Sequence, residues 1–337
     1  MNWYIQSGKE SDVVISTRIR LARNMQEFKF NIKNEKEAKI LENKIKEEAP
    51  TIGYGLKFFS LKDMDDITKM SLVEKHLISP EFALNKANIG AILINEEENI
   101  CIMINEEDHF RLQVFNCGLD LDGTFNLAKE VDTKLDQTFN IAKSKKYGYL
   151  TSCPTNVGTA LRASVMLHLP GLSKTGNIRK ILETINSFGM EIRGVYGENS
   201  EISGDMYQIS NKKTLGLTEE DIIKNLKAIT EKVVQQERVA RKYLTRNKME
   251  LEDNVYRSFG ILSNCRKISS EETRKILSNI KLGTDLGIIK ELTDLKVKKL
   301  YLYTKPANLQ KLLGAQYDSF DRDIKRAEVA RKIINDN

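Results

Sequence analysis

The sequence predicts an α+β fold, in which an antiparallel β-sheet flanked by helices is followed by a small all-helical C-terminal domain. Two short apolar runs, residues 90–95 and 99–104, are separated by three glutamates, a pattern typical of a β-hairpin. Beyond residue 250 the chain is rich in lysine and has few strand signals. We therefore expect a first domain over residues 1–250 and a helical domain over residues 251–337.

Helices are expected where apolar residues recur every three or four positions among polar ones. In the first domain this pattern predicts helices over residues 35–49, 61–77 and 122–144, and another after Thr218, a suitable N-cap. Between them we expect a strand and turns at 147–159, an apolar strand at 165–169, a Gly-punctuated loop at 192–198 and a short strand at 206–211. In the helical domain the pattern predicts helices over residues 271–280, 306–313 and 322–334.

Composition narrows the classes of protein. The 337 residues include 53 basic and 47 acidic ones, and the net charge of +6 suits an anionic nucleotide, a nucleic acid or an acidic membrane about equally. No zinc-finger or RNP-like motif occurs, so direct nucleic-acid binding is not expected. The four cysteines form no C-x-x-C pair, and no apolar run approaches the roughly 20 residues of a membrane span. We expect a cytoplasmic protein that does not associate with membranes.

Three carboxylates, a histidine and an arginine follow a predicted buried strand, in the sequence NEEDHFR at residues 105–111. Carboxylates crowded into one site raise each other's pKa unless cations bind them, so the cluster indicates a cationic ligand, a metal or a general base. An acidic surface turn is the simpler alternative. We expect Asp108 and His109 to shape the cluster rather than to take part in chemistry, and His168 to be a strand residue.

Arginines recur beside predicted strand ends and Gly-rich turns: Arg18, Arg20, Arg111, Arg162 and Arg193. Arg18 and Arg20 are two positions apart and would share one face of a strand. Each of these arginines, considered alone, would be a solvated surface residue. Together with the acidic cluster they indicate a cradle for a polyphosphate, because guanidinium groups fork onto phosphate oxygens. No glycine loop is expected, since residues 171–176 have P-loop glycine spacing without the Lys and Ser/Thr that must follow.

Four motifs, in order, resemble those of the phosphagen (guanidino) kinases, the creatine and arginine kinase family. They are STRIR at residues 16–20, NEEDHFR at 105–111, CPTNVGTALRA at 153–163 and RGVYGE at 193–198. The resemblance extends over residues 12–240 and implies the guanido kinase catalytic fold. Within the family, the run at residues 152–158 and the helical C-terminal domain are similar to those of bacterial protein arginine kinases.

The resemblance implies ATP as the phosphoryl donor, accompanied by Mg²⁺ that no protein side chain is expected to ligate. It also implies that the five arginines bind the ATP phosphates, with His76 beside the base, and that Glu107 and Glu198 hold the guanidinium to be phosphorylated. Physical chemistry agrees, because a guanidinium with a pKa above about 12 is a poor nucleophile until a carboxylate orients it and accepts a proton. Cys153 matches the family's reactive thiol, and a turn residue without a chemical role is the open alternative.

Two further observations bear on the substrate. The motif at residues 16–20 begins near the N-terminus, so we expect no counterpart of the helical domain of about 100 residues that encloses the small guanidine in animal relatives. An open acceptor site suits a polypeptide. RDIKRA at residues 322–327 matches the RDxxRA motif of protein arginine kinases, which implies that Arg322, Asp323 and Arg326 recognise phosphoarginine and contribute to dimerisation. On its own this stretch would be a salt-bridged helix face.

We therefore expect a kinase that phosphorylates arginine residues of proteins, marks those proteins for regulated degradation and controls a stress repressor. The resemblance implies the repressor CtsR, the zinc-binding activator McsA and the ClpC/ClpP protease as partners, and a homodimer. Two alternatives stay open. One is a phosphagen-type kinase of free arginine, and the other is a phosphoarginine-binding adaptor whose kinase half is inactive.

Overall fold

The strands form one large sheet and one small one. The structure is a computed structural model that describes residues 2–85, 89–194 and 204–336. Its strands are β1 (Val14–Arg23), β2 (Lys57–Ser60), β3 (Ala91–Ile94), β4 (Ile100–Ile104), β5 (Phe110–Cys117), β6 (Lys143–Ser144), β7 (Gly148–Tyr149), β8 (Leu161–His168), β9 (Met190–Gly194) and β10 (Met206–Asn211). Within the described residues, eight strands form an antiparallel sheet in the order β2-β3-β4-β5-β1-β8-β10-β9, and β6 pairs with β7.

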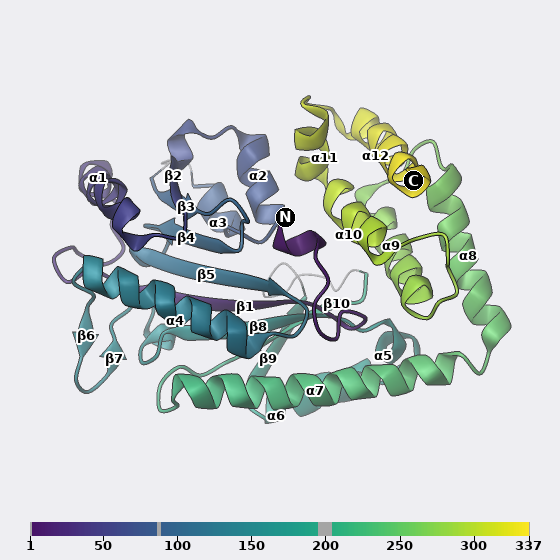
Figure 1. Cartoon of the computed structure of the whole chain (residues 1–337), viewed down its shortest axis with the longest axis horizontal. Coiled ribbons are helices and arrows are strands. Elements are labelled where there is room, and N and C mark those ends of the chain that lie inside the picture. The colour runs from purple at the N-terminus through teal and green to yellow at the C-terminus, as the bar shows by residue number, and fades with distance from the viewer. Residues whose placement is uncertain (1, 86–88, 195–203, 337) are drawn as a thin grey trace.

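Helices cover both faces of the large sheet. They are η1 (Trp3–Ile5), α1 (Glu35–Ile52), η2 (Leu61–Asp63), α2 (Asp66–Glu74), α3 (Pro80–Ala83), α4 (Leu121–Thr138), η3 (Pro154–Asn156), α5 (Pro170–Lys174), α6 (Ile178–Ser187), α7 (Glu219–Leu244), α8 (Lys248–Asn264), α9 (Ser270–Asp285), α10 (Asp294–Tyr303), α11 (Pro306–Leu313) and α12 (Ser319–Asn335). On one face α4 packs on β1 and β5, and α7 packs on β8 and β10 (Figure 1). Cys101 and Met103 of β4 pack with α2 on the other face. None of the described helices has the length and apolar character needed to cross a membrane.

Alternation along β1 separates the core from the opposite face. Ile19 and Leu21 are buried in the apolar cluster that α4 covers. Arg18 and Arg20 are only half-buried. Because successive side chains of a strand point to opposite faces, these two arginines lie on the face away from α4. The expectation that they share one face of a strand is confirmed.

Arg23, the last residue of β1, joins the helix layer to a loop on which the site depends. Its fully buried guanidinium forms a two-pronged ion pair with Asp132 of α4, with both N–O distances at 2.8 Å. The guanidinium carbon Cζ of Arg23 lies 3.4 Å from the centroid of the Tyr149 ring. Its Nη1 donates to the carbonyl of Thr159 at 3.2 Å. One buried charge therefore holds both ends of residues 149–159.

Most predicted elements are present. The hairpin is formed by β3 and β4, Thr218 caps α7, and the predicted strand at residues 206–211 is β10. The helix predicted over residues 122–144 is too long, because Phe139 adopts an extended conformation to bury its ring and α4 ends at Thr138. Residues 192–194, expected in a loop, belong to β9, which pairs with β10. Helices α3, α5, α6, α8 and α10 were not predicted.

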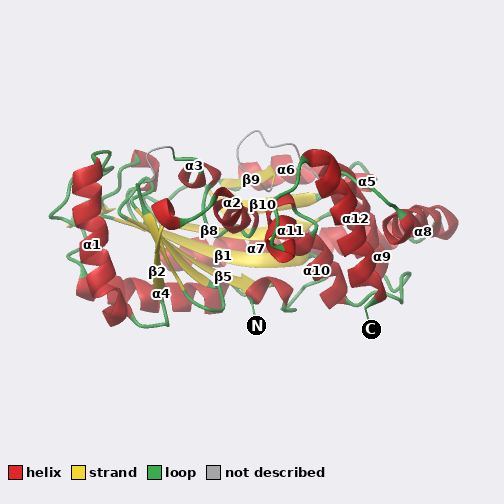
Figure 2. Cartoon of the chain, turned by 90° about the horizontal axis from the view of Figure 1, so that it is seen from above, coloured by secondary structure: helices red, strands yellow, loops and turns green. Residues whose placement is uncertain are grey.

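Helices α8, α9, α10 and α12 share an apolar core of their own at one end of the sheet (Figure 1). The predicted division at residue 250 falls inside α8. Figure 2 shows α11 beside α2, and hydrogen bonds to the carboxylate of one α2 residue connect the two helices. The buried side chain of Glu74, the last residue of α2, accepts hydrogen bonds from the backbone N–H groups of Ala307 and Asn308, both at 2.8 Å. Glu74 thus caps the N-terminus of α11 from the other domain.

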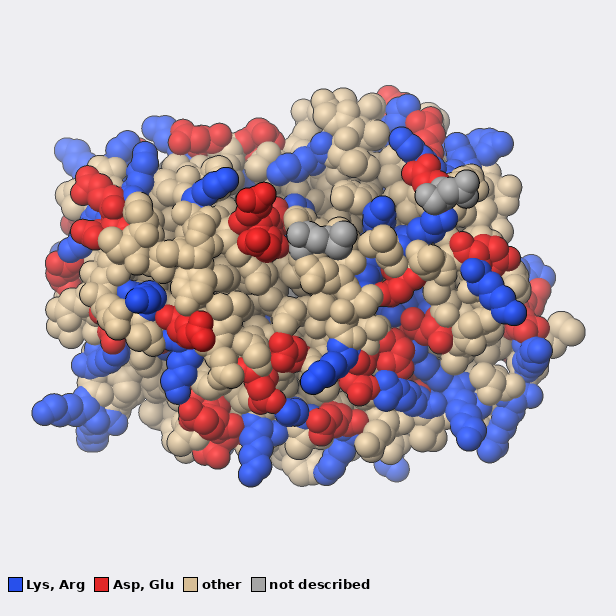
Figure 3. Space-filling view, in the orientation of Figure 1, with Lys and Arg blue, Asp and Glu red and all other residues tan. Residues whose placement is uncertain are grey.

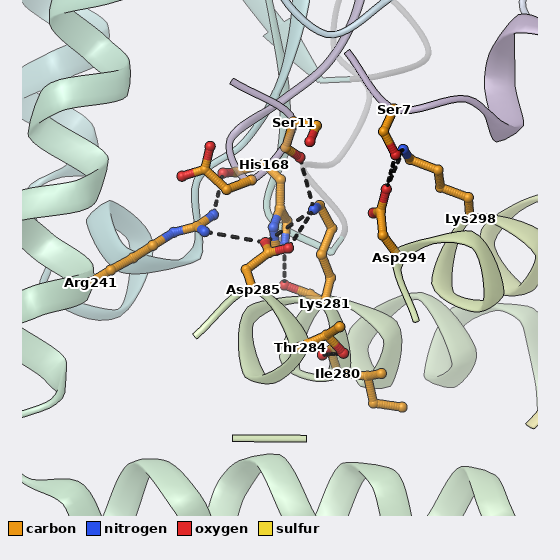
Figure 4. A network of polar contacts seen from close by, with 12 residues as sticks. Ser7, Ser11, His168, Arg241, Ile280, Lys281, Thr284, Asp285, Asp294 and Lys298 are labelled. Carbon is orange, nitrogen blue, oxygen red and sulfur yellow. Dashed lines mark hydrogen bonds and ion pairs between the residues drawn. The ribbon is translucent and has the colours of Figure 1, made fainter. Parts of the chain in front are cut away.

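A buried polar network makes the second contact between the domains (Figure 4). Arg241 of α7 donates to the carbonyl of His168 and pairs with Asp285 of α9, both at 3.2 Å. Lys281, one turn before Asp285, pairs with it at 3.0 Å and donates to the carbonyl of Ser11 at 3.2 Å. His168 is indeed the last residue of a strand, β8, and is fully buried in this contact.

Replacing Asp132 tests the importance of the buried pair with Arg23. We expect Asp132→Ala to lower the free energy of unfolding by about 3–5 kcal/mol, because the buried guanidinium loses both of its short ion-pair contacts and keeps only Glu219 at 4.0 Å. Urea denaturation followed by circular dichroism measures the change. Asp122→Ala removes an exposed pair with Lys227 from the same helix and should cost less than about 1 kcal/mol. Equal losses in the two variants would contradict the prediction.

Candidate active site

Sheet register gathers four arginines on one face. In the pairing of β1 with β8, Arg20 lies opposite Arg162. In the pairing of β1 with β5, Ala22 lies opposite Arg111. Residues directly opposite each other share a face, and Ala22 follows Arg20 at the strand period of two, so Arg111 also lies on the face of Arg18 and Arg20. This row of arginines crosses the centre of the sheet, on the face opposite α4 and α7.

Arg18 and Arg20 of β1 are poorly neutralised. Arg18 donates to the neutral amide of Gln208 at 2.9 Å. The buried Nε of Arg20 has no hydrogen-bond partner among the described residues. Burial, followed by the guanidiniums of Arg111 and Arg162, lowers the pKa of Arg18 to about 9. Burial, followed by the charges of Arg18, Arg111 and Arg162, lowers the pKa of Arg20 well below its usual value. Arginine stays protonated in proteins, so these directions indicate repulsion that a bound polyanion would relieve.

The outer arginines of the row have carboxylate partners. Arg111 pairs with Glu106 at 2.6 Å, and Arg162 pairs with Glu191 at 3.1 Å. Although burial raises the pKa of Glu106, the charge and hydrogen bond of Arg111, with a hydrogen bond from Ser79, hold it below its usual value. Glu106 is therefore ionised and structural, and is not the carboxylate available to a ligand.

Glu107, the predicted catalytic carboxylate, is exposed in the turn between β4 and β5. Burial, followed by the charges of Asp108 and Glu106, raises its pKa, while Arg111 and a hydrogen bond from the Cys153 thiol oppose the shift. The structure thus brings Glu107 and Cys153 together beside Arg111. The sulfur of Cys153 lies 3.0 Å from the hydroxyl of Thr155.

Asp108 is the buried link between the turn that carries Glu107 and the loop that carries Cys153. Its Oδ1 accepts hydrogen bonds from the side-chain amide of Asn24 and the backbone N–H of Ser152, both at 2.6 Å. Asn24 also accepts from the backbone N–H of His109 at 2.9 Å. His109 is fully buried, and its Nδ1 accepts a hydrogen bond from the backbone N–H that follows Asn24. Asp108 and His109 therefore fix the shape of the site.

His76 lies at one end of the row of arginines. It follows α2 in the left-handed region, with φ +64°. Burial, followed by the charges of Lys305 and Arg18, lowers its pKa well below the usual value, so its imidazole is neutral. His76 and Arg18 line one small pocket whose other walls include Trp3, Ser16, Phe115, Ser164, Met166 and Gln208.

The two remaining predicted residues of the first domain are Arg193 and Glu198. The backbone of Arg193, on β9, pairs with Gln208 of β10, the residue that Arg18 contacts. Glu198 lies outside the described residues, so its predicted role stays a prediction.

The predicted phosphoarginine-binding residues lie on α12 in the helical domain. Arg326 is fully buried, donates to the carbonyls of Thr304 and Ile268, both at 2.8 Å, and pairs with Asp323. Its Nη2 and the Nε of Arg322 are buried, and neither has a hydrogen-bond partner within the described residues. Arg326 thus holds three segments together.

Several residues at the site were not predicted. Ser164, Glu191 and Gln208 contact arginines of the row, as does Glu106, which belongs to the predicted acidic cluster. Ser164 and Glu191 each lie two positions from a predicted arginine, so the strand period could have found them. Lys and Arg are interspersed with Asp and Glu on the face in Figure 3. In the described ranges no group of three or more His, Cys, Asp or Glu side chains could hold a metal ion.

Comparison with known proteins shows the family to which the chain is related. A model of the ATP:guanido phosphotransferase C-terminal catalytic domain matches residues 38–240, and a model of the protein-arginine kinase McsB C-terminal domain matches residues 248–337. A protein-arginine kinase of Halothermothrix orenii is 46% identical over 99% of this chain and 96% of its own length. The chain belongs to the protein-arginine kinase family. That of Bacillus subtilis is 45% identical over 99% of this chain and 93% of its own length. The expected family is confirmed, and the chain is an enzyme of the guanido phosphotransferase type.

Solved structures agree on the fold. The substrate-free duplicated taurocyamine kinase from Schistosoma mansoni is 28% identical, with a TM-score of 0.58, over 69% of this chain and 35% of that chain. Lombricine kinase has a TM-score of 0.59 at 24% identity, over 69% of this chain and 68% of its own, and shows the fold alone. The expected antiparallel sheet flanked by helices is confirmed.

Removing Asp108 should loosen the loop that carries Cys153. In Asp108→Ala the backbone N–H of Ser152 loses a charge-assisted hydrogen bond, so we expect its amide hydrogen to exchange about 10-fold faster or more. Hydrogen exchange measured by mass spectrometry on peptides covering residues 150–156 tests this. Glu96→Ala removes an exposed carboxylate from the turn between β3 and β4 and should leave exchange there unchanged. Unchanged exchange in Asp108→Ala would show that Asp108 does not hold the loop.

Proposed function

We propose that the chain transfers the γ-phosphoryl group of ATP to arginine side chains of proteins. The proposal rests on the row of four arginines beside Glu107, a carboxylate exposed at the edge of the row. The related proteins support the acceptor, since they are protein-arginine kinases over nearly the whole chain. An exposed carboxylate favours an arginine presented by a polypeptide, because a protruding side chain can reach it without being enclosed.

Each group has a role in this reaction. Arg18, Arg20, Arg111 and Arg162, joined by Arg193, bind the phosphates and neutralise the charge that develops on the transferred group. Glu107 orients the substrate guanidinium and accepts its proton as a nitrogen–phosphorus bond forms and the bond from that phosphorus to the bridging oxygen breaks, releasing ADP. The raised pKa of Glu107 suits a base. We assign the second carboxylate to Glu198 and a place beside the acceptor to Cys153.

The Mg²⁺ that accompanies ATP is assigned to the nucleotide. The described residues offer it no cluster of carboxylates, histidines or cysteines, and the arginines that face the phosphates cannot ligate a cation. We therefore propose that phosphate oxygens and water hold the ion, which neutralises part of the phosphate charge. His76 and Arg18 then lie at the nucleoside end of the site.

The cellular role is proposed from family membership. We propose that the enzyme acts in the cytoplasm as a homodimer, that McsA activates it, and that its products include the repressor CtsR and proteins delivered to ClpC/ClpP. We further propose that Arg322, Asp323 and Arg326 bind phosphoarginine, which the two unpartnered N–H groups support. The kinase residues are present, which argues against an adaptor with an inactive kinase half.

The deciding experiment offers Mg-ATP with either an unfolded arginine-rich protein or free arginine. Mass spectrometry under conditions that preserve P–N bonds should find phosphate on protein arginines. Glu107→Gln should lower kcat about 10²–10⁴-fold with ATP affinity unchanged, because the base is lost and the phosphate site is kept. Glu96→Gln, an exposed carboxylate in the turn between β3 and β4, is the matched control. Phosphorylation of free arginine alone, or normal activity of Glu107→Gln, would contradict the proposal.

Phosphoarginine binding is tested in the helical domain of the intact chain. Arg322→Ala should weaken binding of free phosphoarginine about 10–100-fold in calorimetry, because a charge-assisted hydrogen bond to phosphate is lost. Lys325→Ala removes an exposed cation of the same helix and should leave affinity unchanged. Equal affinities for the wild type and Arg322→Ala would leave Arg322 without this role.

A further inference from the structure

Glu191 of β9 places a negative charge on the face of the sheet that carries the row of arginines. In the pairing of β9 with β10 it lies opposite Ser210, which lies opposite Ser164 in the pairing of β10 with β8. Ser164 in turn lies opposite Arg18 of β1. Because residues directly opposite each other share a face, Glu191 lies on the face of Arg18. The candidate site therefore includes a carboxylate on β9.

The ion pair that Glu191 makes crosses a strand. The Nη2 of Arg162 on β8 donates to the Oε2 of Glu191 at 3.1 Å, although β10 lies between the two strands that carry these residues. Neighbouring strands are about 4.8 Å apart, so the two side chains together span about 10 Å of sheet. On its other side Arg162 lies opposite Arg20 of β1, which repels it. Glu191 therefore attracts the guanidinium of Arg162 away from the centre of the row.

The carboxylate at the other end of the row is held more firmly. The side chain of Glu106 is 12% exposed, and one of its oxygens accepts from both Arg111 at 2.6 Å and the hydroxyl of Ser79 at 2.7 Å. The side chain of Glu191 is 21% exposed, and its contact with Arg162 is the longer of the two ion pairs. An ion pair that is longer and closer to water costs less to separate. Of the two carboxylates, Glu191 is the one that a ligand can displace.

A polyphosphate that binds across the row competes with Glu191 for Arg162. Phosphate and carboxylate oxygens accept from the same N–H groups of a guanidinium, so a phosphate gains only the difference between the two interactions. A bound phosphate chain also offsets the repulsion between Arg162 and Arg20, which removes the reason for Arg162 to lean towards β9. Glu191 therefore lowers the affinity of the row for every phosphate ligand that contacts Arg162.

We propose that Glu191 is a displaceable counter-ion of Arg162, which pairs with this arginine before the nucleotide binds and gives it up to the nucleotide phosphates. This inference rests on the proposed function, because Arg162 is taken to bind phosphate there. Glu191 acts through Arg162 and is a positioning residue. By limiting the affinity for ATP and ADP alike, it allows the diphosphate product to leave a site that is rich in arginine.

Glu191→Gln tests the proposal, because it removes the charge and keeps the size of the side chain and a hydrogen-bonding oxygen. Calorimetry on the full-length chain should show binding of Mg-ATP, ADP and inorganic tripolyphosphate each about 3–10-fold tighter, since separation of the ion pair no longer opposes binding. The inhibition constant of ADP in the kinase reaction should fall by a similar factor. Loss of a residue that only supports the fold would not tighten binding.

The effect should depend on Arg162. In an Arg162→Ala background, Glu191→Gln should change the affinity for tripolyphosphate less than about 2-fold, because the pair that it would break is already absent. An equal gain in both backgrounds would show that Glu191 does not act through Arg162 and would overturn the inference.

Glu183→Gln is the matched control. It removes an exposed carboxylate from α6, a helix that contacts β9 and buries Ile185 in the apolar core on the opposite face, and it should leave all three affinities unchanged. Weaker or unchanged binding in Glu191→Gln, or an equal gain in Glu183→Gln, would overturn the inference and leave the proposed function intact as long as the wild type binds Mg-ATP. Absence of Mg-ATP binding to the wild type would overturn both.

Discussion

Electrostatic repulsion among the guanidinium groups of the arginine row opposes folding of the sheet, and the rest of the structure must overcome it. Arg20 faces Arg162 directly across two strands, and Arg18 and Arg111 lie within the same row. No attraction among these side chains selects the arrangement. Backbone hydrogen bonds between antiparallel strands, and the apolar core on the opposite face, hold the like charges together. Glu106 and Glu191 neutralise only the outer members. The remaining positive charge attracts a polyanion before any ligand is positioned.

Much of this arrangement could be predicted because it is local in the sequence. Arg18 and Arg20 share a face through the period of a strand, which two residues suffice to show. The hairpin of β3 and β4 needs only two apolar runs and a polar turn. The order of the family motifs indicated the remaining arginines, but it did not show which residues they face on neighbouring strands. Sequence alone could not have shown that Arg20 faces Arg162, because the pairing depends on strands more than a hundred residues apart.

Other features were beyond prediction because a distant partner creates them. Nothing near Asp108 in the sequence indicates that it accepts the backbone N–H of Ser152, and nothing near Trp3 indicates a stacked ring on β5. From the sequence alone, Arg326 would lie on a salt-bridged helix surface. In the structure it donates hydrogen bonds to the carbonyls of Thr304 and Ile268. The early end of α4 has the same origin, since Phe139 leaves the helix for the core of the first domain. Each case requires tertiary structure to override a local pattern.

Family models divide the chain into two modules, one ending at residue 240 and the next beginning at 248. In the structure, however, the two modules share contacts. Glu74 supplies a cap to α11, and Asp285 supplies a counter-charge to Arg241, so each module completes a backbone or charge requirement of the other. In a catalytic fragment cut after α7, the carboxylate of Glu74 would lose its backbone donors, and Arg241 would keep Glu237 but lose Asp285. The two modules are thus interdependent, and neither half can be expected to report the behaviour of the whole.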